Sequence, residues 1–364
     1  MHKIRTYNAI SAKGLNRFPR DSYQIGSDIA DPQGYILRSQ KLHDEPVPES
    51  LVAVARAGAG VNNIPVADYT NKGIVIFNSP GANANAVKEL IVVGLLLGSR
   101  DIYGGMNYVQ ELDHMDDAGE MGKLLEKEKK RFAGSEIAGK TLGVVGLGAI
   151  GSIIANLGLE LGMDVIGYDP AISVEAAWRL SGRVARMENL QALLAKADFV
   201  TLHVPAIPAT KDLINSETLA LMKSSAKVLN FAREQIVNTE AMVAALDKGV
   251  IAGYISDFPV PELLGRKDVL LMPHIGASTA EAEENCAVMA ANQLMDFIEN
   301  GNIKNSVNFP STKMARNGGT RLTFCNSNVP KVLGNVLSIL ADFKQWSGIS
   351  PKTYRTTVRA KLFN

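Results

Sequence analysis

Short apolar runs alternate with polar or helical segments along most of the chain. In the first third, β-rich runs occupy residues 34–37, 51–55 and 73–77. Strand-length runs that are separated by helical segments are typical of a parallel sheet covered by helices. The pattern therefore predicts an α/β domain over residues 1–100.

A second alternation of strand and helix signals begins at Thr141 and continues to about His274. The apolar runs that carry it are residues 141–145, 164–168, 199–203, 228–231 and 269–272. Such an alternation predicts a second doubly wound parallel sheet. The expected fold class is therefore α/β, with two doubly wound parallel-sheet domains.

Two segments in the middle of the chain have the composition of helices. Residues 85–100 are apolar at nearly every position after Glu89, which favours a helix buried between the two domains. Residues 120–132 are rich in charge and predict a solvated helix or loop. A substrate-facing role for Lys130 or Arg131 is the alternative for this second segment.

A long helix is predicted over residues 280–300, and Gly301 after it is a C-terminal cap signal. This helix would carry the chain back to the first domain. We therefore expect one domain, the substrate-binding domain, from residues 1–100 and 282–310. The other domain would comprise residues 101–281.

Composition narrows the classes of function. The chain has 364 residues, and 46% of them are hydrophobic, which supports folded cores. Its 38 basic and 37 acidic residues give a net charge of +1, so no overall field favours nucleic acid or an anionic membrane as a partner. No stretch reaches the ~20 apolar residues of a membrane span, and the amino terminus has no apolar core of signal-peptide length. We therefore expect a cytoplasmic protein.

The chain contains two cysteines, Cys286 and Cys325, and five histidines. The cysteines provide neither a disulfide framework nor the spacing of metal ligands. We expect two buried free thiols and no metal site.

Gly146, Gly148 and Gly151 form a Gly-x-Gly-x-x-Gly pattern directly after an apolar strand and directly before a helix. The first glycine would make a tight turn, the second would admit a pyrophosphate, and the third would permit close packing of helix on strand. The amino terminus of the helix supplies free N–H donors and a positive dipole end for phosphates. This combination predicts a dinucleotide site.

Asp169 ends the next strand, where its carboxylate could accept hydrogen bonds from the adenosine ribose hydroxyls. Its charge would repel a 2′-phosphate, so the predicted cofactor is NAD and not NADP. The alternative is a glycine turn in a sheet that binds no nucleotide, with Asp169 as an ordinary strand-end residue.

Three side chains after the glycine pattern suit hydride transfer from a hydroxyl-bearing carbon. Arg233 follows a strand, and its planar guanidinium could bind a carboxylate through two hydrogen bonds. His274 also ends a strand and is the natural proton carrier near neutral pH. Glu262 could pair with the imidazole and orient it.

Each of these residues has a simpler interpretation when taken singly. Arg233 could form a surface ion pair, Glu262 could be a solvated loop acid, and His274 could be a packed strand-end residue. Because all three follow strands of the sheet that carries the glycine pattern, we favour the catalytic interpretation.

Four motifs together resemble those of the D-isomer-specific 2-hydroxyacid dehydrogenases, over about residues 34–310. They are Gly-Leu-Gly-Ala-Ile-Gly at 146–151, Asn-Phe-Ala-Arg at 230–233, Asp-Phe-Pro-Val-Pro-Glu at 257–262 and Pro-His-Ile-Gly-Ala-Ser-Thr at 273–279. The resemblance implies a flavodoxin-like substrate domain and a Rossmann NAD domain. It implies Arg233 as substrate anchor, His274 as acid/base and Glu262 as the acid that pairs with the imidazole of His274. It also implies NAD contacts at Ala149, Ile150, Val204, Pro205, Ala232, Asp257, Gly276 and Ala277.

Residues 56–63 resemble the substrate loop of those family members that oxidise 3-phospho-D-glycerate, in which an arginine contacts the phosphate. The resemblance implies substrate contacts at Arg56, Ala57, Gly58 and Gly60. Residues 83–89 resemble another substrate-facing segment of the family, which implies a contact at Asn83. The two glycines would let backbone amides reach the substrate carboxylate. Arg56 could instead be an ordinary surface charge.

The chain departs from the family pattern at two places. Glu234-Gln235 stands where the family usually has glycine, and it adds a negative charge beside an anionic substrate. Residues 321–336 resemble the first strand and helix of a serine-sensing ACT domain, and that resemblance ends after Asp342. One strand and one helix cannot form a stable sheet alone, so we expect residues 319–364 to form an incomplete regulatory segment.

The resemblance implies NAD-dependent oxidation of a phosphorylated 2-hydroxy acid, 3-phospho-D-glycerate, to 3-phosphooxypyruvate in L-serine biosynthesis, by a homodimer or homotetramer. Reduction of glyoxylate or hydroxypyruvate is the second interpretation, and it differs in whether Arg56 faces a phosphate. The third is a non-catalytic NAD-sensing protein that controls a partner. The complete set of Arg233, Glu262 and His274 argues against the third interpretation.

Overall fold

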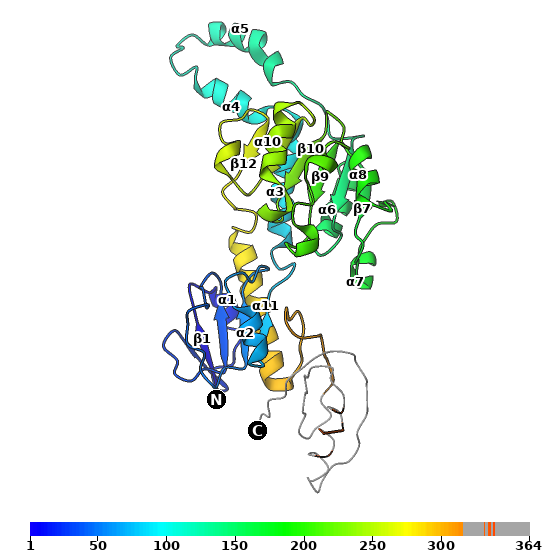
Figure 1. Cartoon of the computed structure of the whole chain (residues 1–364). Coiled ribbons are helices and arrows are strands. Elements are labelled where there is room, and N and C mark those ends of the chain that lie inside the picture. The colour runs from blue at the N-terminus through cyan, green and yellow to red at the C-terminus, as the bar shows by residue number, and fades with distance from the viewer. Residues whose placement is uncertain (316–330, 332–333, 336–337, 339–364) are drawn as a thin grey trace. The chain divides into compact units, whose positions relative to one another are not determined.

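The computed structural model of the chain describes residues 1–315 and four single positions beyond them, residues 331, 334, 335 and 338. The chain divides into two compact units (Figure 1). The first comprises Met1–Asn83 with Ala280–Asn364, and the second comprises Ala84–Thr279. The expected regulatory segment and Cys325 lie outside the described residues, apart from the four single positions.

The first unit is built on a sheet of five parallel strands in the order β2-β1-β3-β4-β5. This is the strand order of flavodoxin-like doubly wound folds. The predicted fold class of this part of the chain is confirmed. The strands are β1 (His2–Thr6), β2 (Tyr23–Gly26), β3 (Gly34–Leu37), β4 (Ala53–Arg56) and β5 (Val75–Phe77).

Helix α11 packs against β3, β4 and β5 of this sheet and against α1. The close approach of α1 requires Gly14, because a Cβ there would lie 2.5 Å from the Cβ of Ala287 on α11. Cys286 on α11 is buried and free, as expected. The helices of this unit are α1 (Ala12–Leu15), α2 (Val66–Asn71) and α11 (Ala280–Asn300).

The second unit contains seven parallel strands in the order β12-β11-β10-β9-β6-β7-β8. The strand order reverses between β6 and β9, and ligands of such sheets lie beyond the carboxyl ends of the strands at that reversal. The predicted Rossmann sheet is therefore confirmed. The strands are β6 (Thr141–Val145), β7 (Asp164–Tyr168), β8 (Ala185–Arg186), β9 (Phe199–Leu202), β10 (Lys227–Asn230), β11 (Gly253–Ser256) and β12 (Val269–Leu271).

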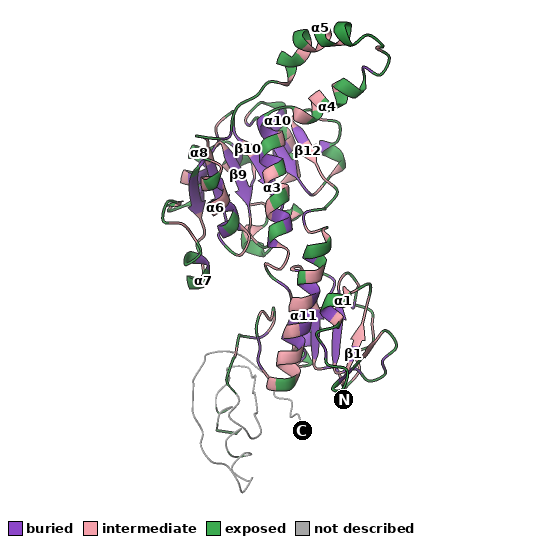
Figure 2. Ribbon diagram, turned by 180° about the vertical axis from the view of Figure 1, so that it is seen from behind, coloured by how far each residue is buried: buried purple, intermediate pink, exposed green. Residues whose placement is uncertain are grey.

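Helix α3 (Ala84–Ser99) packs on this seven-stranded sheet. Its Gly94 faces the ring of Phe231 and the side chain of Ile255, and a Cβ at Gly94 would lie 3.1 Å from that ring. We expected the first domain to extend to about residue 100, whereas α3 clusters with the second unit. In Figure 2, β9 and β10 are coloured as buried. The other helices around the sheet are α6 (Gly151–Glu160), α7 (Val174–Ala177), α8 (Leu190–Lys196), α9 (Ser216–Leu219) and α10 (Thr239–Asp247).

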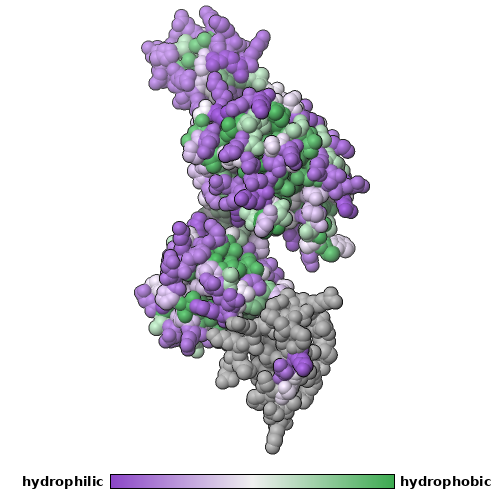
Figure 3. All heavy atoms as spheres, in the orientation of Figure 1, coloured by the Kyte–Doolittle hydropathy of each residue, from purple (hydrophilic) through white to green (hydrophobic). Residues whose placement is uncertain are grey.

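Two helices of the second unit, α4 (Ile102–Gln110) and α5 (Ala118–Glu128), have no buried residue. The visible face of this segment is mostly hydrophilic in Figure 3. The charge-rich segment at residues 120–132, most of which lies in α5, is thus a solvated helix. This is one of the two forms that its sequence predicts. Arg131, in the 3-10 turn after α5, forms an ion pair with Glu128 at 2.9 Å.

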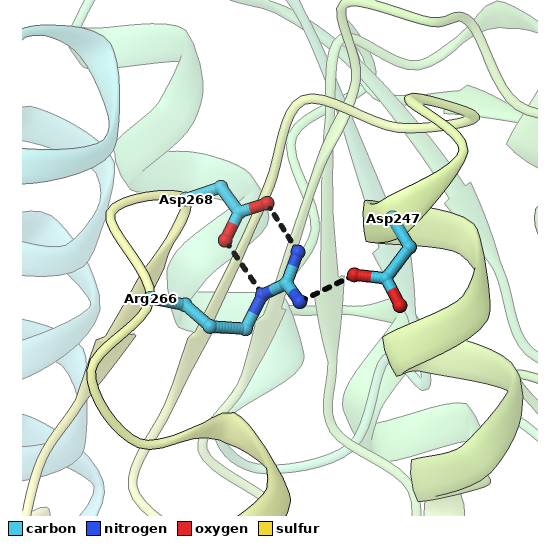
Figure 4. Close-up of polar contacts among 3 residues, drawn as sticks. All are labelled: Asp247, Arg266 and Asp268. Carbon is cyan, nitrogen blue, oxygen red and sulfur yellow. Dashed lines mark hydrogen bonds and ion pairs between the residues drawn. The ribbon is translucent and has the colours of Figure 1, made fainter.

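A triad of charged side chains ties α10 to the start of β12 (Figure 4). Arg266 donates from Nε and Nη2 to the two carboxylate oxygens of Asp268, both at 2.9 Å, and from Nη1 to Asp247 at 2.6 Å. Asp247 is the last residue of α10, and Asp268 directly precedes β12.

In the part of the chain that the structure describes, no helix is long and apolar enough to span a bilayer.

Candidate active site

The glycine turn between β6 and α6 has the geometry that its sequence predicts. Gly146 has a φ of +89°, in the left-handed region, and a Cβ there would lie 2.7 Å from the carbonyl oxygen of His203. A Cβ at Gly151 would overlap the carbonyl oxygen of Gly146, so only glycine lets α6 begin so close to β6. No atom lies within 4 Å of a Cβ built on Gly148, which leaves an open approach to the turn. These features fit a bound pyrophosphate.

Asp169 follows β7 and lies beside the glycine turn. Its carboxylate accepts hydrogen bonds from the backbone N–H of Leu147 at 2.8 Å and of Ala171 at 2.9 Å. Each carboxylate oxygen has a second lone pair for another donor. The half-buried Asp169 is therefore fixed next to the turn and can still accept from a ribose hydroxyl.

His203 lies below the same turn and was not among the expected site residues. Its backbone N–H donates to Val145 at 2.7 Å, and its Nε2 lies 2.9 Å from the hydroxyl of Thr201. Desolvation of the imidazole lowers the pKa of His203 to about 3. The side chain is therefore neutral at pH 7. The expected nucleotide contacts Val204 and Pro205 follow it directly, Val204 half-buried and Pro205 exposed.

Arg233 leaves the carboxyl end of β10 and precedes the 3-10 turn Glu234–Ile236. Its side chain is half-buried, and Nη1 donates to the carbonyl oxygen of Ala232 at 2.5 Å. Desolvation lowers the pKa of Arg233, although a guanidinium stays charged in proteins. The other four N–H donors of this cation bond to no described residue and remain available to an anion.

His274 follows β12 with a φ of +56°, a conformation that is uncommon for a residue other than glycine. Its side chain is exposed, and its ring meets the ring of Phe258 edge-on, with centroids 4.9 Å apart. The turn after it is held by Asp257, whose two carboxylate oxygens accept from the backbone N–H of Ile275 at 2.8 Å and of Gly276 at 2.7 Å. Asp257 is only 1% exposed.

The expected partner of the imidazole, Glu262, is an exposed residue of the 3-10 turn Pro261–Leu263. Among the described residues, no hydrogen bond or ion pair joins its carboxylate to His274. The pairing of these two side chains stays a prediction, because hydrogen bonds of catalytic groups often tighten only when ligand binds.

In the first unit, Arg56 ends β4, and Gly58 follows with a φ of +151°. A Cβ on Gly58 would overlap the Arg56 guanidinium, so a larger residue there would force the flexible arginine side chain to move away from the loop. The loop is tied to its surroundings by the Ser79 hydroxyl, which donates to the Arg56 carbonyl oxygen at 3.1 Å. The expected contacts Ala57 and Gly60 lie in the same loop, and Asn83 has a buried Oδ1 that accepts no hydrogen bond from a described residue.

Sequence reasoning missed Arg38, which follows β3 next to Arg56. Leu37 pairs with Arg56 across the two strands, and Arg56 Nε donates to the carbonyl oxygen of Arg38 at 3.0 Å. The Arg38 side chain forms an ion pair with Glu283 at 2.6 Å. The available signal was its place at the carboxyl end of an apolar strand, as for Arg233.

Sequence reasoning also missed three polar side chains in the core of the second unit, Asn230, Tyr254 and Ser256. They were detectable as polar positions within otherwise apolar strands. No group of His, Cys, Asp or Glu in the described part of the chain has the arrangement of a metal site.

The strand order and the glycine turn together define a Rossmann dinucleotide-binding unit. Residues 105–276 match the family model described as D-isomer specific 2-hydroxyacid dehydrogenase, NAD binding domain. The chain is 34% identical to D-3-phosphoglycerate dehydrogenase of Escherichia coli (strain K12), over 88% of this chain and 78% of that protein. The chain therefore belongs to the D-isomer-specific 2-hydroxyacid dehydrogenase family. The match to the NAD binding domain confirms NAD as the cofactor.

Other relatives differ in length. The chain is 39% identical to D-3-phosphoglycerate dehydrogenase of Synechocystis sp., over 71% of this chain and 45% of that protein. It spans about half the length of several curated relatives that it matches.

Among solved structures, NAD⁺-bound 3-phosphoglycerate dehydrogenase from Entamoeba histolytica is 25% identical, with a TM-score of 0.66 over 84% of this chain and 98% of that chain. The NADPH-dependent glyoxylate/hydroxypyruvate reductase from Sinorhizobium meliloti is 21% identical, with a TM-score of 0.69 over 84% of this chain and 98% of that chain. The second likeness shows a shared fold.

Proposed function

We propose that the chain catalyses the NAD-dependent oxidation of 3-phospho-D-glycerate to 3-phosphooxypyruvate, the first step of L-serine biosynthesis. The observation that carries the proposal is that Arg233 and His274 follow β10 and β12 of the sheet that carries the glycine turn. The relatives named D-3-phosphoglycerate dehydrogenase support this choice of substrate.

The roles that we propose follow from the chemistry of each side chain. NAD, when bound, accepts the hydride from the hydroxyl-bearing carbon. Arg233 binds the substrate carboxylate, and the imidazole of His274 takes the hydroxyl proton. Glu262 orients that imidazole. The αL backbone of His274 is held by Asp257, so the ring is presented from a fixed turn.

The cofactor contacts that we propose extend from the glycine turn along the carboxyl edge of the sheet. The turn holds the pyrophosphate, and the carboxylate of Asp169 accepts from the ribose. The remaining contacts are Ala149, Ile150, Val204, Pro205, Ala232, Asp257, Gly276 and Ala277. Asp257 contributes through the turn that it holds, because both of its oxygens already accept backbone N–H groups.

The first unit supplies the proposed phosphate and carboxylate contacts. Arg56 leaves the carboxyl end of β4 and gives a guanidinium group for a phosphate, whereas Arg38, at the end of the neighbouring strand β3, is paired with Glu283. Backbone amides of the loop at residues 57–60 and the amide of Asn83 would meet the carboxylate end. A cytoplasmic location and a homodimeric or homotetrameric assembly stay predictions from composition and from the family resemblance.

Reduction of glyoxylate or hydroxypyruvate is the second candidate. It is favoured by one observation, the exposed carboxylate of Glu234 directly after Arg233, which opposes a doubly charged phosphate. The two reactions separate experimentally, because hydroxypyruvate and 3-phosphooxypyruvate differ only in the phosphate.

The test is the loss of NADH fluorescence when the purified chain is mixed with 3-phosphooxypyruvate, hydroxypyruvate or glyoxylate, repeated with His274→Ala. We expect rapid loss with the phosphorylated ketone and none with the variant. Preference for an unphosphorylated ketone would favour the second candidate, reduction of glyoxylate or hydroxypyruvate. NADH binding without turnover of any ketone would refute both.

A matched variant tests the phosphate contact. Arg56→Gln keeps a hydrogen-bonding side chain but removes the charge. A charge-assisted hydrogen bond contributes about 1.5–3 kcal/mol, so KM for 3-phosphooxypyruvate should rise roughly tenfold or more. KM for hydroxypyruvate should stay within about twofold, because that substrate has no phosphate to lose. Equal changes for both ketones would contradict a phosphate contact.

A further inference from the structure

Three buried polar side chains form one hydrogen-bonded chain inside the second unit. Asn230 at the end of β10 and Ser256 at the end of β11 are 0% exposed, and Tyr254 between them is 4% exposed. Asn230 Nδ2 donates to the Tyr254 hydroxyl at 3.3 Å, and that hydroxyl donates to Ser256 Oγ at 3.2 Å. These hydrogen bonds therefore bridge the neighbouring strands β10 and β11.

Each end of this polar chain holds the backbone of a loop in the candidate site. Asn230 Nδ2 also donates to the carbonyl oxygen of Arg233 at 2.9 Å, and Asn230 Oδ1 accepts from the N–H of Ala232 at 3.2 Å. Ser256 Oγ accepts from the N–H of Phe258 at 3.0 Å. The ring of Phe258 in turn contacts the imidazole of His274.

We propose that the Tyr254 hydroxyl is a positioning group. It keeps Arg233 and the Phe258–His274 ring pair in a fixed position relative to each other. The inference rests on the roles of Arg233 and His274 in the proposed function. Displacements of about 1 Å in a catalytic group can lower a rate by a factor of ~100, so loops that meet one substrate need a common anchor. Tyr254 joins the only two anchors that the described side chains of β10 and β11 provide for these loops.

Packing alone does not account for three polar groups at these positions. Burying a hydroxyl or an amide is unfavourable unless it is hydrogen-bonded, and an apolar side chain of similar size would fill the same space.

Tyr254→Phe removes the central hydroxyl and keeps the ring. We expect kcat/KM for 3-phosphooxypyruvate to fall roughly tenfold, because Arg233 and His274 no longer share an anchor. NADH affinity, measured by fluorescence titration, should stay within about twofold, because the glycine turn is untouched. The imidazole resonances of His274 should shift in the NMR spectrum, because they sense the nearby ring of Phe258, while those of His203 stay in place.

Tyr69→Phe is the matched control. Tyr69 is 1% exposed in the first unit, and its hydroxyl has no hydrogen-bond partner among the described residues. Its removal should change neither kcat/KM nor the His274 resonances. If Tyr254→Phe does not fold, Ser256→Ala removes the last hydroxyl of the same hydrogen-bonded series. It should give the same kinetic and spectroscopic changes.

Unchanged kcat/KM and unchanged His274 resonances in Tyr254→Phe would overturn the inference, as would a lower melting temperature with no other change. The spectrum separates this failure from failure of the proposed function. If the unsubstituted chain turns over no ketone, the proposed function fails, and the His274 resonances still report whether Tyr254 positions that ring.

Discussion

Lowering the pH from 7 to 5 is expected to destabilise the second unit through the imidazole of His203. Desolvation lowers the pKa of this group in the folded chain to about 3, from an ordinary value of 6.5. Between these values the unfolded chain binds a proton that the folded chain does not bind. The stabilising contribution is therefore complete above about pH 6.5 and is lost as the pH falls toward 3.

The size of the effect follows from the difference between the two pKa values. Each pH unit in this window removes about 1.4 kcal/mol from the free energy of unfolding. At pH 5 the loss is about 2 kcal/mol, and near pH 3 it approaches about 5 kcal/mol. A typical domain is stable by only about 5–15 kcal/mol, so the loss at pH 5 is readily measured.

The assay is urea denaturation followed by circular dichroism at pH 7.0, 6.0 and 5.0, with His203→Gln beside the unsubstituted chain. The glutamine does not titrate, so its stability should fall by about 2 kcal/mol less between pH 7 and pH 5. His114→Gln is the control, because the His114 side chain is 71% exposed. Equal losses in the His203→Gln and unsubstituted proteins would refute a desolvated, neutral imidazole.

Three further predictions concern the second unit. Gly148→Ala should weaken NADH binding without changing the melting temperature, because its Cβ meets no atom of the fold. Gly151→Ala should lower both the affinity for NADH and the melting temperature. Asp257→Asn should lower the free energy of unfolding by about 1–3 kcal/mol and reduce kcat. The two carboxylate oxygens of Asp257 each accept one backbone N–H, and the amide nitrogen of asparagine cannot accept the second. Thermal unfolding and kinetics test this prediction. Arg266→Gln should cost about 1 kcal/mol in urea denaturation, because its ion pairs are partly exposed.

The parts of the fold that the sequence predicts are those in which local pattern and burial agree. Strand β3 is buried at all four positions, and its apolar run is continuous. Strand β1 escaped prediction because only Ile4 in it is buried, and its Arg5 is satisfied by a distant carbonyl oxygen, that of Ile29. No periodicity in five residues can report such a long-range hydrogen bond.

The same distinction applies to the candidate site. The glycine turn was predictable because a pattern of six consecutive residues, 146–151, carries it. The tertiary contact that makes Gly146 necessary, with the carbonyl oxygen of His203, was not visible in that pattern. The function of the Asp257 carboxylate in holding the turn after His274 was not predictable, since it depends on β11 and β12 being adjacent. The polar chain through Tyr254 depends in the same way on the pairing of β10 with β11.

The glutamate after Arg233 weakens the case for a phosphorylated substrate less than its sequence position suggests. Glu234 is exposed, so its carboxylate acts through water, where two unit charges 4 Å apart interact by only about 1 kcal/mol, and salt lowers this further. The guanidinium of Arg233 is half-buried, and an anion bound to it is attracted through a medium of lower dielectric constant. The attraction to Arg233 therefore exceeds the repulsion from Glu234, and the glutamate should affect the rate of substrate approach more than the affinity.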